Sequence, residues 1–177
     1  LCEFVASVAF GELPAEVLNV LRTGEVVAQR KGETEVRPLL VAATLRRLGL
    51  RAVVKAKKEQ LREAAGDNQY GVGRKSGAQL LKKRLEAAVE LRPAAVVLKV
   101  DLKAAFQNMH RDKAYAAVTT CEAEVASVLQ TWYEGESTHL WRDIGGHYHE
   151  IGSTRGFDQG CPLAAAAFAI GQRSVLD

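Results

Sequence analysis

The stretch Val96–Phe106, VVLKVDLKAAF, decides how this sequence is divided into helices and strands. Apart from Lys99, its first five residues are apolar and mostly valine, which predicts a buried strand. That strand would end at Asp101, and a carboxylate at the end of an apolar run is costly unless a cation lies beside it. Taken alone, Asp101 has three possible roles: cap of the next helix, member of a buried ion pair, or metal ligand at the carboxyl end of a strand.

Helical and alternating patterns surround this stretch on both sides. Two hairpins are predicted, one with strands over 25–29 and 35–40 and a turn at 30–34, the other with strands over 138–141 and 146–151. Helices are predicted from Pro14 to just before Gly24, over 41–65 with a break at Gly49, and over 76–91, 112–121, 122–133 and 162–177. Because helices and strands are mixed and no linker is visible, the fold class is α+β (mixed α/β) with one core.

Composition limits the class of protein. The chain has 177 residues, of which 47% are hydrophobic and 25% charged, as in an ordinary globular domain. No apolar run approaches the roughly 20 residues that span a bilayer, and the N-terminal stretch lacks the basic start of a secretory signal. The three cysteines include no CxxC pair, which favours a reducing compartment. We therefore expect an intracellular protein of the nucleus or cytoplasm, neither secreted nor bound to a membrane.

Positive charge is concentrated in one part of the chain. Residues 30–84 contain 15 Lys or Arg residues and 5 Asp or Glu residues, a balance of +10, whereas the whole chain carries only +3. Such asymmetry is typical of a face that meets a polyanion, although solvated helix faces explain it as well.

Two further stretches have residue types that suit ligand binding. In RGFDQGCPLA (Arg155–Ala164), glycines at 156 and 160 permit a close backbone approach, and Gln159 between them offers a donor and an acceptor. In KGETEVRPL (Lys31–Leu39), Lys31 and Arg37 could hold phosphates. A tight loop-to-helix connection and a surface hairpin with scattered charge are the alternatives.

Together, and in this order, these stretches resemble the polymerase domain of reverse transcriptases, especially those of non-LTR retroelements and group II introns. Lys31 with Arg37–Leu39 is similar to the fingers motif, a basic residue followed by R-P-[IL]. The loop Gln69–Gly71, followed by a helix, is similar to the next block of the family. The palm motif D-x-x-x-A-[FY] is matched by Asp101, Ala105 and Phe106, and the motif G-x-x-Q-G-x-P-L by residues 156–163.

The resemblance implies the fingers and amino-terminal palm of a right-hand polymerase, with the thumb absent. Residues 1–177 would form a partial reverse transcriptase domain, of which about 1–92 are mostly fingers. About 93–177 would be palm with a fingers/palm insertion, ending before the Y-x-D-D motif. The implied activity is RNA-directed DNA polymerisation, in which a primer 3′-hydroxyl attacks a dNTP with the help of two Mg²⁺ ions, or Mn²⁺ in their place. The implied partners are a dNTP and an RNA or DNA template-primer.

The resemblance also assigns roles to individual residues. Asp101 would be the catalytic metal ligand, assisted by the backbone carbonyl of Leu102. Phe106 would reject a ribose 2′-hydroxyl, with a plain core aromatic as the alternative. The other residues implied are Lys31 and Arg37 for the triphosphate, Gln159 and Gly160 for the nucleotide pocket, and Arg30, Gln69, Tyr70, Gly71, Arg74 and Gly156 for nucleic acid.

One part of the family pattern is missing, because the sequence contains no Asp-Asp pair. The other two catalytic carboxylates of the family are therefore not matched, and we expect the isolated chain to be inactive. Two alternatives stay open: a non-catalytic nucleic-acid-binding module derived from such an enzyme, and an unrelated α/β domain with chance motifs. His147 and His149, which alternate on one strand face, are interpreted as ordinary surface residues.

Overall fold

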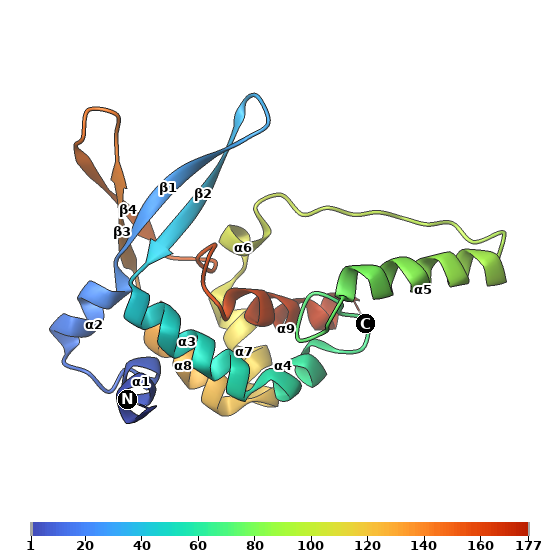
Figure 1. Cartoon of the computed structure of the whole chain (residues 1–177), viewed down its shortest axis with the longest axis horizontal. Helices are drawn as coiled ribbons and strands as arrows, with labels where there is room; N and C mark the ends of the chain where they lie inside the picture. The colour runs from blue at the N-terminus through green and yellow to red at the C-terminus, as the bar shows by residue number, and fades with distance from the viewer. Residues whose placement is uncertain (1, 177) are drawn as a thin grey trace.

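A four-stranded sheet made of two hairpins rises from a helical body in the computed structural model, which describes residues 2–176, with side chains through residue 173 (Figure 1). Strands β1 (Gly24–Lys31) and β2 (Glu35–Ala42) pair antiparallel, as do β3 (Ser137–Arg142) and β4 (Tyr148–Ser153). A short parallel pairing, Glu25 with Leu140 and Val26 with Trp141, joins β1 to β3 and gives the order β2-β1-β3-β4. The hairpins meet at their bases, and their tips diverge.

Helices build the body below the sheet and enclose the apolar core. The core is formed mainly by α3, α4, α7, α8 and α9, and its fully buried side chains include Leu50, Leu61, Val118 and Leu129. The N-terminal helix is attached by the indole Nε1 of Trp132, which donates to the carbonyl of Ala9 at 3.0 Å. The bounds of the helices are α1 Cys2–Phe10, α2 Ala15–Arg22, α3 Thr44–Ala56, α4 Lys58–Ala65, α5 Gly77–Leu91, α6 Ala105–Asn108, α7 Arg111–Cys121, α8 Ala123–Tyr133 and α9 Ala164–Leu176.

The α+β class and both hairpins predicted from the sequence are confirmed, and the predicted helices begin and end within a few residues of the observed ones. The break predicted at Gly49 is wrong, since α3 continues through it and the helices separate at Lys57. Gly49 serves close packing instead, because a Cβ there would lie 3.1 Å from the backbone nitrogen of Ala9. Cys2, Cys121 and Cys161 are all free thiols.

The buried strand predicted over Val96–Val100 is also wrong. The chain between α5 and α6 is irregular and exposed, with Val96 93%, Leu98 84% and Val100 72% accessible. The composition favours a strand, but no other strand of residues 2–176 lies beside this segment to pair with it. Asp101 is not a helix cap either, because α6 begins after Ala104, which has φ 50°.

Among residues 2–176, no single helix is long and apolar enough to cross a membrane. One pair, α1 and α2, passes the same test jointly by length and composition, although its helices are bent by 81°.

Candidate functional site

A cavity of about 660 Å³ lies where three stretches distant in the sequence meet. The β1–β2 hairpin contributes Lys31 and Arg37, the segment leading into α6 contributes Asp101, and α6 contributes Phe106. Gln159, from the loop before α9, completes the set. Most of the residues that the sequence marked as catalytic or nucleotide-binding, Leu102 included, therefore line one cavity.

Cations predominate on the cavity wall. Lys31 Nζ lies 3.1 Å from a carboxylate oxygen of Glu35, but both side chains are 58% exposed, so this pair is weak. Arg37 and Lys103 line the same cavity, and neither forms an ion pair with any described residue. The lining contains two carboxylates, Glu35 and Asp101, and Asp101 forms no ion pair with a described residue. Three cations against two carboxylates suit an anionic ligand such as a phosphate.

The Phe106 side chain lines the cavity and also packs against the apolar core. Its ring packs on Phe168 of α9 with a centroid separation of 5.1 Å and an interplanar angle of 52°. The same side chain lines the cavity. The packing against α9 holds the ring in place, and the role of Phe106 in rejecting a ribose 2′-hydroxyl stays a prediction.

Backbone hydrogen bonds hold Gln159 at the cavity. The loop before α9 donates from Gly156 N to the Met109 carbonyl at 2.9 Å and from Phe157 N to the Phe106 carbonyl at 2.8 Å. The backbone carbonyl of Gln159 accepts a hydrogen bond from Leu40 N of β2 at 3.1 Å. The side-chain Oε1 of Gln159 accepts one from Gln107 Nε2 at 3.3 Å. The loop is therefore attached on one side to α6 and on the other to the β1–β2 hairpin.

The two glycines of this loop bring parts of the same chain together. Gly156 is buried with φ +71°, and a Cβ there would lie 2.3 Å from the Gln107 carbonyl oxygen. Gly160 has φ +118°, and a Cβ there would lie 2.9 Å from the Leu40 carbonyl oxygen. Sequence reasoning expected these glycines to admit another molecule, but the close approach that they allow is to α6 and β2. Neither glycine lines the cavity.

A buried charged cluster forms around Asp158 of the same loop, and it was not predicted from the sequence. Arg46 of α3, 1% exposed, places Nη2 2.9 Å from Asp158 Oδ2, and His139 Nε2 lies 3.2 Å from Asp158 Oδ1. Burial alone would raise the pKa of Asp158, but the neighbouring His139 imidazole and the guanidinium of Arg46 bring it below its usual value. Arg46 also stacks over Trp132 and Tyr133 at 5.3 and 5.1 Å. The carboxylate next to Gln159 is thus held charged and fixed.

Arg111, the first residue of α7, is a second buried cation that stabilises the loop. Its guanidinium donates to the carbonyls of Gly156 at 2.8 Å, Tyr133 at 3.0 Å and Gly135 at 2.9 Å. A further nitrogen donates to Ser153 of β4. Because these carbonyls belong to three separate segments, Arg111 joins the loop to β4 and to the end of α8.

The remaining residues predicted to contact nucleic acid lie apart from the cavity. Arg30 is exposed on β1 and donates to the Gly32 carbonyl at 3.1 Å. The loop before α5 forms a compact group in which Arg84 donates to the Tyr70 hydroxyl at 2.6 Å and Arg74 donates to the Gln69 carbonyl at 3.0 Å. Gln69 in turn accepts from the Gly71 backbone N–H at 2.7 Å. Their contacts to nucleic acid stay predictions.

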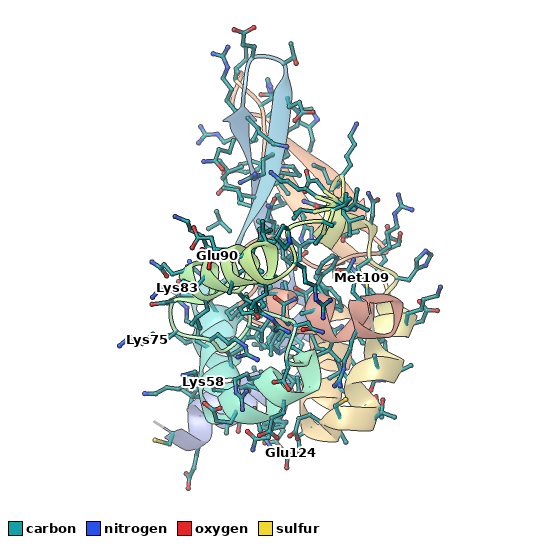
Figure 2. The ribbon with its side chains drawn as sticks, turned by 90° about the vertical axis from the view of Figure 1, so that its right-hand side faces the viewer. Lys58, Lys75, Lys83, Glu90, Met109 and Glu124 are labelled. Atoms are coloured by element: carbon teal, nitrogen blue, oxygen red, sulfur yellow. The ribbon has the colours of Figure 1, made fainter. Side chains whose placement is uncertain are left out.

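The basic segment 30–84 is only partly available to a polyanion. Six of its 15 cations form ion pairs with described residues, and one of those six, Arg46, is buried. Lys58, Lys75 and Lys83, which form none, appear along the same side of the molecule in Figure 2. The positive surface is therefore smaller than the sequence count indicates.

Searches of protein-family models, curated proteins and solved structures find no match to this chain. Within residues 2–176, no three His, Cys, Asp or Glu side chains are grouped as ligands for a metal ion.

Proposed function

We propose that this chain carries the nucleotide-binding and template-contacting part of an RNA-directed DNA polymerase of the reverse transcriptase class. The observation that carries the proposal is the cavity in which Lys31, Arg37, Asp101, Phe106 and Gln159 meet. They come from three motifs, in the order in which the polymerase domain has them.

Each wall of the cavity suits a different part of a nucleotide. The hairpin cations Lys31 and Arg37 suit a triphosphate, since a guanidinium binds paired oxygens and an ammonium adds a point charge. The Phe106 ring suits the apolar face of a sugar, and the Gln159 amide suits a base edge with its donor and acceptor. The substrate class proposed is therefore a deoxynucleoside triphosphate opposite a template strand.

The carboxylates of the described residues do not fit the two Mg²⁺ ions of polymerase chemistry. Asp101 is the unpaired carboxylate of the cavity, Glu35 lies 3.1 Å from Lys31 Nζ, and the described part of the chain has no group of three metal-binding side chains. Mg²⁺ usually requires more than one carboxylate beside the substrate phosphates. We therefore derive no catalytic step, and we propose that this chain by itself binds without polymerising.

Neutralising the hairpin cations tests the proposal. In fluorescence anisotropy with a fluorescently labelled dNTP, Lys31→Ala/Arg37→Ala should weaken binding about tenfold, because both proposed contacts to the triphosphate are lost. Lys113→Ala, an exposed lysine of α7 outside the cavity, is the matched control. Equal dNTP affinity of the double variant and the wild type would contradict the proposed nucleotide site. Mg²⁺-dependent primer extension by the wild-type chain that Asp101→Ala abolishes would contradict the proposal that the chain binds without polymerising.

A non-catalytic nucleic-acid-binding module is the second candidate, and it is favoured by Lys58, Lys75 and Lys83, which form no ion pair with a described residue and appear on one side of the molecule in Figure 2. Under this alternative, reversing Lys58, Lys75 and Lys83 to glutamate would weaken template-primer binding more than the hairpin double variant does. Asp101→Asn and added dNTP would then have no effect on binding.

A further inference from the structure

Residues 96–102, between α5 and α6, form an extended segment that belongs to no helix or strand and whose apolar side chains are exposed. It runs back along the length of α5 in Figure 1. No described residue forms a hydrogen bond with the backbone of residues 96–102. Apolar side chains with high exposure are costly, and an unpaired backbone of strand-forming composition is a template for another strand.

Side chains alternate along this segment as they do on a strand with one apolar face. Leu98, Val100 and Leu102 are 84%, 72% and 52% exposed and share one side of an extended chain. Lys99 and Asp101 share the other side with Val97, which is 54% exposed, and neither charged residue forms an ion pair with a described residue. The segment therefore has one wholly apolar face and one face that carries both charges.

We infer that the occupant of this edge is a second copy of the same segment, paired antiparallel about a two-fold axis at Val100. In this register Val100 faces Val100 of the second copy, and Leu98 faces Leu102. Lys99 of each copy lies opposite Asp101 of the other, which gives two complementary charge pairs on the same face.

Charge selects this register over its neighbours. Centring the pair on Lys99 places two lysines opposite each other, and centring it on Asp101 places two carboxylates opposite each other. A parallel pair in register opposes like charges at both positions. A centre beyond Asp101 shortens the ladder, because the chain turns at Ala104 with φ 50° and enters α6.

The exposed apolar face of α5 extends the surface available to the dimer. Leu81 and Leu85 of α5 are 50% and 44% exposed. A ribbon of this length is a small interface, and we expect a dissociation constant on the order of 10 μM. This dimer requires no ligand, but it shares Asp101 and Leu102 with the cavity of the proposed nucleotide site.

Charge reversal and its compensation test the register. Analytical ultracentrifugation of the full chain from 1 to 100 μM should show a monomer–dimer equilibrium. Lys99→Asp alone or Asp101→Lys alone places like charges opposite each other and should weaken association about tenfold or more. The double variant Lys99→Asp/Asp101→Lys restores both pairs and should dimerise like the wild type. An equimolar mixture of the two single variants should form a heterodimer.

The control is Lys83→Asp, an exposed lysine of α5 that forms no ion pair with a described residue; it should leave association unchanged. Circular dichroism checks that each variant is folded. A wild-type chain that is monomeric at 100 μM would overturn the inference. Single variants that associate as well as the wild type would also overturn it, because another surface would then form the contact.

Discussion

Replacing Arg46 with alanine should lower the free energy of unfolding by about 3 to 5 kcal/mol. The substitution leaves Asp158 buried without its guanidinium partner at 2.9 Å and removes a cation stacked over Trp132 and Tyr133. It also opens a cavity where a side chain 1% exposed had been. Guanidinium chloride unfolding followed by tryptophan fluorescence measures this loss, since Trp132 is buried beside the cluster.

Arg51→Ala is the matched control for Arg46→Ala. Arg51 lies on the same helix, is exposed and forms no ion pair with a described residue, so its loss should change stability by less than about 0.5 kcal/mol. A loss below about 1 kcal/mol for Arg46→Ala would show that the cluster does not stabilise the fold.

Acid should act through the same cluster. Because the pKa of Asp158 is lowered in the folded state, its contribution is complete above the unfolded value of about 4 and is lost as pH falls through the folded value. Asp158→Asn should therefore reduce the slope of stability against pH below about pH 4.

Replacing Gly156 with alanine should cost about 3 kcal/mol of stability. A left-handed φ of +71° costs about 1 to 2 kcal/mol for a residue with a Cβ. In addition, that Cβ would meet the Gln107 carbonyl oxygen at 2.3 Å, so the loop has to move away from α6. The hydrogen bonds from Gly156 to Met109 and from Phe157 to Phe106 would weaken with it. Denaturant unfolding measures the change.

Gly135→Ala separates conformational strain from steric contact. Gly135 has nearly the same φ, +73°, but a Cβ there meets no atom within 4 Å. Its substitution should therefore cost only the strain of about 1 to 2 kcal/mol. Equal losses in the two variants would show that Gly156 does not hold the loop against α6 through close packing.

Local signals in the sequence predicted most of the elements. The β1–β2 hairpin was predicted because alternating apolar residues flank a short polar turn, and α8 because apolar residues recur at helical spacing. The motif residues Lys31, Asp101 and Gln159 were predicted to share a site through a family resemblance, and they line one cavity. No property of one strand or helix alone could have brought them together.

Long-range pairing could not be predicted from local composition. The segment at Val96–Val100 has the residues of a strand, but a strand also requires a neighbour, and none lies beside it within residues 2–176. His139 joins the buried cluster from β3, and no local pattern indicates its contact with Asp158. Arg46 did leave a signal: it lies four residues before Leu50 and seven before Val53, on the apolar stripe of its helix. An arginine at such a position predicts a buried partner of opposite charge.

The most direct test of the central claim is a titration of the ¹⁵N-labelled chain with a dNTP, followed by NMR of the backbone amides. If the cavity is a nucleotide site, the amides of Lys31, Arg37, Phe106 and Gln159 should shift together along one saturation curve. Lys31→Ala/Arg37→Ala should shift that curve to at least tenfold higher dNTP concentration. No shift at millimolar dNTP, or shifts confined to α3 and α4, would contradict the claim that these segments form a nucleotide-binding site.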